Sequence, residues 1–201
     1  MTKEPEAVRI SRLHDLHLWQ HDFPWFYDTM REQVSISEYK IQKWWADRID
    51  VTGKEVNILN SGFGAYALPF CIEKGATHTR LIDMDPITKE ISLQANEGGS
   101  WCHMMMDVTF DYKNIPEADV YINTSCEHSY HMKKVIPNNK LCVLSGCDLT
   151  KRGHINLIRS CDDLIEQAGL SKVIDTSKMT FLYEDELGRR EYSQYFVKGI
   201  K

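Results

Sequence analysis

The sequence lacks the features that would assign it to several specialised classes of protein. None of its six cysteines falls in a C-x-x-C pair, which argues against a zinc knuckle and against a disulfide framework. No apolar run approaches membrane-spanning length, and residues 1–10 include no apolar signal segment, so we expect no membrane association and a cytoplasmic location. The net charge of −5 argues against a broad nucleic-acid-binding surface, because such surfaces carry an excess of lysine and arginine.

The composition that is present is typical of a globular protein with one main domain and an appendage. The chain has 201 residues, of which 42% are hydrophobic and 26% are charged. Residues 1–50 differ from the rest because they hold four of the five tryptophans, and Ser35–Ile49 carries apolar residues at helical spacing. We therefore predict an aromatic-rich helical cap or lid over residues 1–50 and a main domain over residues 51–201.

Segments with strand and helix character alternate from Glu55 onward. The expected strands are Val56–Asn60, Thr79–Asp83, Cys102–Asp107, Asp119–Thr124 and Leu141–Ser145, and the expected helices are Ala65–Glu73, Ile87–Asn96, Glu127–Val135 and Leu157–Ala168. This alternation predicts an α/β fold, in which a parallel sheet has helices on both faces. Two further apolar runs, Met179–Tyr183 and Tyr192–Ile200, predict an antiparallel pair that closes one sheet edge.

The most informative stretch runs from Val56 to Pro86. A short apolar run ends in Asn60-Ser61-Gly62-Phe63-Gly64-Ala65, and a second apolar run ends in Asp83, 21 residues after Gly62. Glycines after one strand and an acid about 20 residues further on are the parts of a nucleotide-binding βαβ unit, in which the acid holds a ribose. The sequence therefore predicts a ligand of the adenosine type.

Five segments in register extend this observation over residues 51–201. They are LNSGFGA, LIDMDP, MMMDVT, ADVYINTSCEH and EQAGLSKV, each placed after an expected strand or at a helix exit. Their order and spacing resemble the class I S-adenosylmethionine-dependent methyltransferase family. The resemblance implies a Rossmann-like, doubly wound sheet of seven mostly parallel strands with an antiparallel terminal hairpin. It also implies S-adenosyl-L-methionine as the cofactor.

The resemblance gives roles to the residues at the strand exits. Gly62 and Gly64 would let the backbone approach the sulfonium and amino-acid end of the cofactor. Asp83 would accept both ribose hydroxyls, and we prefer it to Asp85, which with Pro86 has the character of a helix start.

The adenine would lie between the exits of the second and third strands. Met84 would cover one face of the ring, Asp107 would receive the adenine amino group, and Val108 would lie beside the ring. The chain departs from the family at two positions, because the family often has an acid where Asn60 stands and a third glycine where Tyr66 stands. We still expect Asn60 and Tyr66 to contact the cofactor, and their identities leave room for a relative that does not methylate.

The loop after the fourth strand is the expected catalytic edge, and Asn123, Glu127 and His128 are the candidate residues there. Methyl transfer needs an in-line nucleophile, and Glu127 or His128 could act as a base where the acceptor must lose a proton. We interpret Cys126 as a buried, inert thiol. Glu127 and His131 have a spacing that could bind a metal, but no third ligand accompanies them, so we expect no metal site.

Three functions remain open at this point. The first is a methyltransferase that acts on a small molecule or a peptide, with nucleic acid not favoured as the acceptor. The second is an aminocarboxypropyl transferase, because GFGAYALP followed by IDMDP is similar to enzymes of the nicotianamine-synthase type, in which a tyrosine follows the glycines. The third is a binding module that has lost its chemistry. The sequence identifies neither the acceptor nor the oligomeric state.

Overall fold

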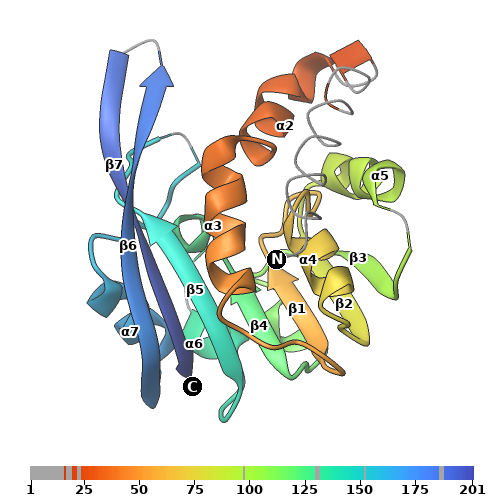
Figure 1. Ribbon diagram of the computed structural model, residues 1–201, viewed down its shortest axis with the longest axis vertical. Coiled ribbons are helices and arrows are strands. Elements are labelled where there is room, and N and C mark those ends of the chain that lie inside the picture. The colour runs from red at the N-terminus through yellow and green to blue at the C-terminus, as the bar shows by residue number, and fades with distance from the viewer. Residues whose placement is uncertain are drawn as a thin grey trace.

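The computed structural model describes residues 24–96, 98–129, 132–151, 153–185 and 188–201, together with Leu16, Gln20 and His21. A seven-stranded sheet has the strand order β3-β2-β1-β4-β5-β7-β6 (Figure 1). The strands are β1 (Glu55–Leu59), β2 (His78–Asp83), β3 (Trp101–Met105), β4 (Val120–Asn123), β5 (Leu141–Cys147), β6 (Lys172–Asp185) and β7 (Gly188–Ile200). Strands β1 to β5 are parallel, and β7 runs antiparallel between β5 and β6. The predicted fold class is confirmed.

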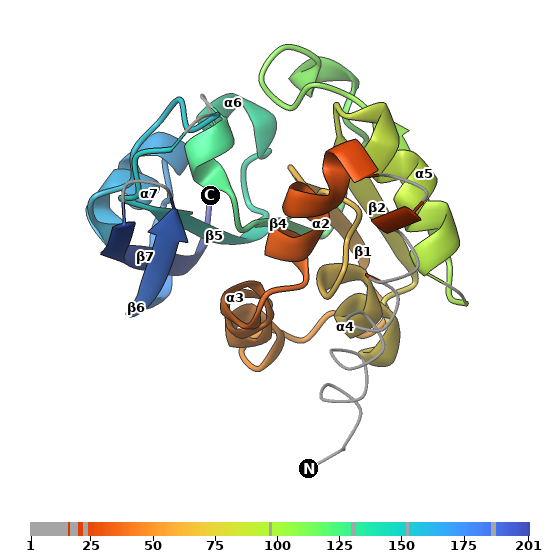
Figure 2. The ribbon, with the colours of Figure 1, turned by 90° about the horizontal axis from the view of Figure 1, so that it is seen from above.

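Helices cover both faces of this sheet, and Figure 2 shows α3 and α4 on one face with α6 and α7 on the other. The helices are α2 (Tyr27–Gln33), α3 (Ile36–Ala46), α4 (Ala67–Glu73), α5 (Pro86–Ala95), α6 (Met132–Val135) and α7 (Cys161–Ala168). Short 3-10 turns are η1 (Pro24–Phe26), η2 (Tyr112–Asn114) and η3 (Cys126–His128). Among the described residues, no helix combines the length and the apolar character needed to cross a membrane.

Several expected elements differ in extent from those in the structure; for example, the helix expected over Leu157–Ala168 begins at Cys161, after the cap residue Ser160. The expected helix Glu127–Val135 is broken into η3 and α6, because Ser129 takes an extended conformation and its hydroxyl accepts hydrogen bonds from Asn60 and Asn123. The terminal strands are longer than expected, since β6 and β7 pair from Lys172 and Ile200 to Asp185 and Gly188, with one irregularity between Val173 and Asp175. The hairpin they form projects past the upper end of the sheet in Figure 1.

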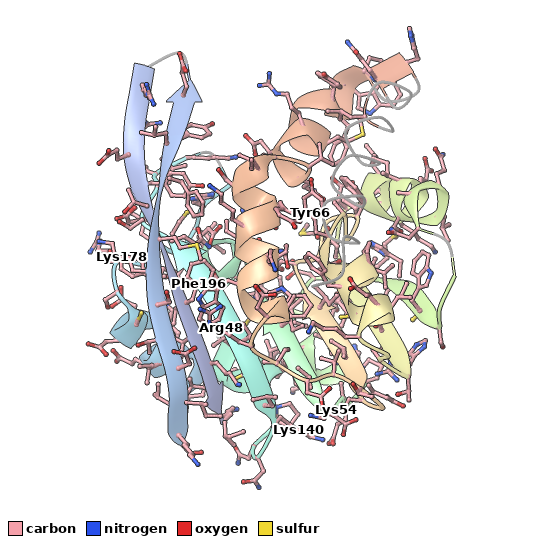
Figure 3. The ribbon with its side chains drawn as sticks, viewed as in Figure 1. Arg48, Lys54, Tyr66, Lys140, Lys178 and Phe196 are labelled. Carbon is pink, nitrogen blue, oxygen red and sulfur yellow. The ribbon has the colours of Figure 1, made fainter. Side chains whose placement is uncertain are left out.

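The N-terminal segment shares its core with the sheet. Trp44 stacks on Phe196 of β7 with 4.8 Å between ring centroids, and Figure 3 shows Phe196 on the side of β7 that faces α3. Trp45 is fully buried, and its Nε1 donates to Gln42, whose amide donates to Thr124 Oγ1 at 2.6 Å. Because α3 is held by both apolar contacts and buried hydrogen bonds, it is packed firmly against the sheet.

The pairing register brings the functional loops to one edge of the sheet. Leu59 lies opposite Ile82, Asp83 opposite Met105, and Asn123 opposite Leu144, so the loops after β1, β2, β3 and β4 leave the same edge of the sheet, and β5 continues beyond that edge to Cys147. Ligands of open α/β sheets bind at this carboxyl edge.

Candidate functional site

A cavity of about 850 Å³ lies along the carboxyl edge of the sheet, within the usual range of roughly 300–1,000 Å³ for ligand pockets. One half is lined by the loops after β1, β2 and β3. The other half is lined by the loops after β4 and β5, by α3 and by the hairpin. Among its lining residues are Asn60, Gly62, Asp83, Met84, Asp107, Val108, Glu38, Glu127, His128, Cys147, His154 and Tyr192.

The glycine turn and Asp83 form one hydrogen-bonded unit. Gly62 has a φ of +53°, and its N–H donates to Asp83 Oδ2 at 2.8 Å. The other oxygen, Oδ1, accepts the N–H of Asp85 at 3.0 Å. A carboxylate has about four acceptor positions, so two remain for a ligand. Burial raises the pKa of Asp83, while the two backbone donors oppose that rise.

Asp85 has a different task from Asp83. Its Oδ1 accepts the N–H of Ile87 at 2.9 Å and so caps α5, with Pro86 at the first helical position. Gly64, with a φ of +71°, packs against Leu81, where an added Cβ would lie 2.8 Å from a methyl group. Gly64 therefore shapes the turn, whereas Gly62 and Asp83 face the cavity.

The turn also has a neighbour that sequence reasoning missed. Gln33, the last residue of α2, accepts the N–H of Phe63 at 3.0 Å through Oε1, and a Cβ added at Gly62 would lie 2.2 Å from that oxygen. Gln33 lines the cavity, so the N-terminal segment forms part of its wall. A contact between residues 30 positions apart leaves no periodic signal in the sequence.

The expected adenine-contacting residues all reach the same half of the cavity. Met84 is 66% exposed and free to cover a planar ring, and Val108 is buried in the cavity wall. Asp107 Oδ1 accepts the N–H groups of Thr109 and Phe110, at 2.7 and 3.2 Å, which fixes the loop. Phe110 is 81% exposed and also lines the cavity; sequence reasoning did not single it out.

Two expected cofactor contacts differ from the prediction in how their polar groups are used. The Asn60 amide donates to Ser125 O at 3.3 Å and to Ser129 Oγ at 3.1 Å, so it ties the β1 exit to the loop after β4. Tyr66 is 1% exposed, and its hydroxyl donates to Val34 O at 2.8 Å. Figure 3 shows Tyr66 between α2 and α4, where its polar end secures the N-terminal segment.

Asn123 does not have the catalytic position that we expected. It is fully buried and is not among the residues that line the cavity. Its Oδ1 accepts the N–H of Ser125 at 2.9 Å, and its amide contacts Ser129 Oγ and Met132 Sδ. Because β4 is buried on both faces, the last residue of the strand points into the protein, and Asn123 shapes the loop instead.

Glu127 is the most unusual polar group in the cavity. The residue is 7% exposed, and its Oε2 has no hydrogen-bond partner among the described residues. Burial, with repulsion from Glu38, raises the pKa of Glu127 to about 8. Glu38 on α3 also has a pKa raised by burial, to about 7, although Gln42 Nε2 donates to its carboxylate. Two acids that resist ionisation at neutral pH are typical of functional sites.

Two histidines lie next to Glu127 in the same half of the cavity. Nδ1 of His128 lies 3.0 Å from Gly153 O, and Nδ1 of His154 lies 2.6 Å from Leu149 O. Their rings meet edge to face with 4.8 Å between centroids. Burial lowers the pKa of both, which favours the neutral imidazole.

Cys126 is fully buried, and burial raises the pKa of its thiol, as expected for an inert cysteine.

His131, which was considered as a metal ligand with Glu127, lies outside the described residues.

The hairpin supplies a wall that the sequence did not suggest. Tyr183, Tyr192 and Gln194 line the cavity from β6 and β7. Gln194 Nε2 donates to Ser145 Oγ at 2.6 Å, which holds this wall to β5.

No protein-family model matches the chain. No curated protein matches it either. Several solved structures of methyltransferases, in contrast, match the structure of this chain. The chain is similar to the magnesium protoporphyrin IX methyltransferase of Synechocystis PCC 6803, determined with bound SAH, with 14% identity, a TM-score of 0.57 and coverage of 81% of this chain and 80% of that one.

Two further solved structures show the same likeness. A S-adenosylmethionine-dependent methyltransferase from Mesorhizobium loti has 11% identity and a TM-score of 0.56, over 82% of this chain and 98% of that one. A protein of Pyrococcus horikoshii described as a candidate RNA methyltransferase has 14% identity and a TM-score of 0.55, over 82% of this chain and 84% of that one. At this identity the likeness concerns the fold, and the chain has the fold of the class I S-adenosylmethionine-dependent methyltransferases.

Proposed function

We propose that this protein is an S-adenosylmethionine-dependent methyltransferase that acts on a small-molecule or peptide acceptor. The observation that carries the proposal is one continuous cavity that joins the glycine turn and Asp83 to Glu127 and His128. Asp83 is tied to Gly62 and still has two acceptor positions for ribose hydroxyls. Met84 and Val108 would enclose the adenine, and Asp107 would take its amino group.

The second half of the cavity would position the acceptor. Methyl transfer depends mainly on holding the nucleophile in line with the sulfonium carbon. His128, as a neutral imidazole beside the cavity, is suited to take a proton from the acceptor, and Glu127 is the alternative base because its raised pKa lies near neutrality. The buried position of Asn123 supports a structural role for that residue.

The charge of the cavity favours a neutral or cationic acceptor over a nucleic acid. Among the lining residues that the structure describes, acids outnumber the one lysine, Lys151; the acids are Glu32, Glu38, Asp83, Asp85, Asp107, Glu127 and Glu184. Because Glu38 and Glu127 have raised pKa values, the negative charge comes mainly from the other acids. A phosphodiester backbone would be repelled by such a wall, since nucleic-acid sites neutralise phosphates with lysine and arginine.

Residues 1–50 would act as a cap that also forms part of the acceptor wall. Gln33, Glu38, Ile41 and Gln42 contribute to the cavity from α2 and α3, while Trp44 and Trp45 anchor the cap in the core. This division into a cap and a cofactor-binding domain of residues 51–201 combines the two roles expected from the sequence.

Calorimetry and product analysis test the proposal together. S-adenosylmethionine should bind to the purified protein, whereas NAD should not. Incubation with a fractionated small-molecule or peptide extract should then yield S-adenosylhomocysteine, identified by mass spectrometry. Binding of NAD but not of S-adenosylmethionine would contradict the proposal.

The aminocarboxypropyl transferase remains the competing reaction for the same cofactor, and its product would be methylthioadenosine. Its sequence argument was Tyr66, whose hydroxyl is bonded to Val34 O and is thus not directed at a ligand. We therefore favour methyl transfer, and the identity of the nucleoside product decides between the two. A binding module without chemistry would yield neither nucleoside.

A further inference from the structure

We propose that Glu127, Cys147 and His154 form a binding site for one divalent transition-metal ion, best suited to zinc. A carboxylate, a thiolate and an imidazole are the three side-chain ligands that zinc uses in proteins. The three residues come from η3, from the end of β5 and from the loop after β5, and each offers one ligand atom within 4.8 Å of the others.

The distances allow an ion with small side-chain movements. Three atoms no more than 4.8 Å apart share a point within about 2.8 Å of each. Zinc bonds to oxygen, nitrogen and sulfur are about 2.0–2.3 Å long, so each donor would move inward by roughly 0.5–0.8 Å. Cys147 Sγ lies 3.9 Å from Nδ1 of His154, so the thiol and the imidazole ring are already neighbours.

An independent observation points to a ligand at this place. Glu127 Oε2 is buried without a hydrogen-bond partner among the described residues. This oxygen lies next to Gly146, the residue before Cys147, since a Cβ added at Gly146 would be 3.1 Å from it. A buried carboxylate oxygen is costly unless a donor or a cation satisfies it. The thiol of Cys147 gives the cluster a donor that suits zinc better than an organic ammonium group, because sulfur is a weak hydrogen-bond acceptor.

The surrounding backbone holds the donors together. The carbonyl of Glu127 accepts the N–H groups of Ile155 at 2.9 Å and Asn156 at 3.1 Å, which fastens the His154 loop to η3. The contact of His154 Nδ1 with Leu149 O at 2.6 Å fixes the orientation of the ring, and because a nitrogen that donates to a carbonyl cannot also bind a metal, Nε2 would be the ligand atom. Backbone carbonyls that orient a histidine ring are a common feature of metal sites, where they preset the ligand.

Three protein ligands leave one position open, as in catalytic zinc sites. All three residues line the cavity, so the open position faces the acceptor half. An acceptor oxygen, nitrogen or sulfur could occupy it, which would leave His128 as the base; this last step rests on the proposed function. Metal binding itself does not, and it can be measured without S-adenosylmethionine.

The test uses the full chain after removal of metal with a chelator. Titration with Zn²⁺ should give one equivalent per chain, and Co²⁺ should give a sulfur-to-cobalt charge-transfer band together with tetrahedral visible bands. His154→Ala should weaken zinc binding more than about 100-fold, since even outer-shell changes at such sites cost 10- to 100-fold. Cys147→Ser should abolish the charge-transfer band.

Cys161→Ser is the matched control, because the Cys161 thiol is partly buried and donates to Ser177 O and Phe196 O, and Cys161 does not line the cavity. It should keep both signals. Thermal unfolding of each variant checks the fold, and His154, which is only half-buried, keeps the test valid should Cys147→Ser fail to fold. The proposal would be overturned by zinc binding that persists in His154→Ala, by the absence of binding to the wild type, or by stabilisation with an organic diamine but not with zinc.

Discussion

The replacement of Asp83 by asparagine is the sharpest single perturbation of the proposed cofactor site. Asp83→Asn keeps the shape of the side chain but leaves one acceptor oxygen in place of two. In the protein the two carboxylate oxygens already accept the N–H groups of Gly62 and Asp85, at 2.8 and 3.0 Å. The variant can therefore serve one backbone group and at most one ribose hydroxyl.

The expected loss follows from the charge-assisted hydrogen bond that disappears. Such bonds contribute about 1.5–3 kcal/mol, so the variant should lose about that much binding free energy. That corresponds to roughly 10- to 150-fold weaker binding of S-adenosylhomocysteine, measured by calorimetry.

Asp85→Asn supplies the matched control, because Asp85 lines the same cavity, two residues away, and carries the same charge. Its role is to cap α5 through Ile87 N–H, and asparagine caps helices about as well as aspartate. The control should change affinity less than about 3-fold, since a second charge in the cavity is screened by solvent. An equal loss in both variants, or none in Asp83→Asn, would refute the assignment of the ribose to Asp83.

Four further outcomes are expected. Because burial raises the pKa of Asp83 and only the carboxylate accepts both hydroxyls, cofactor affinity should fall as the pH is lowered through that raised pKa, and calorimetry on Asp83→Asn should show a flatter pH profile. Gly62→Ala should lower the free energy of unfolding, measured in urea, by about 1–2 kcal/mol, since alanine is strained at a φ of +53°. The added Cβ would also clash with Gln33, so the double variant with Gln33→Ala should recover the loss due to this clash but not the loss due to backbone strain. Trp44→Ala should lower the free energy of unfolding by about 3–5 kcal/mol, whereas a detachable lid would lose almost none. His128→Ala should lower kcat by about 10²- to 10⁴-fold with unchanged cofactor affinity, and an unchanged kcat would exclude it as the base.

The fold was largely predictable because its signals are local. The first two βα units each carry an apolar run, a turn and a helix, and the position of Asp83 at the end of β2 follows from that pattern alone. The same is true of Asp85, where an aspartate before a proline marks a helix start.

The site was less predictable because side-chain direction is set by packing. Asn123 and Tyr66 stand at the expected places in the chain, yet burial turns their polar groups toward Ser125 and Val34. Gln33 and Cys147 reach the cavity from elements far apart in the sequence, and neither carries a local signal of its role. Spacing within one helix suggested Glu127 with His131 as metal ligands, whereas the structure groups Glu127 with donors from two other segments.

A crystal structure of the protein with S-adenosylhomocysteine tests the central claim most directly. Our account predicts both ribose hydroxyls within hydrogen-bond distance of the Asp83 carboxylate, the adenine beside Met84 and Val108, and the sulfur directed toward His128. Density for the nucleoside at another surface, or a ribose that makes no contact with Asp83, would contradict it.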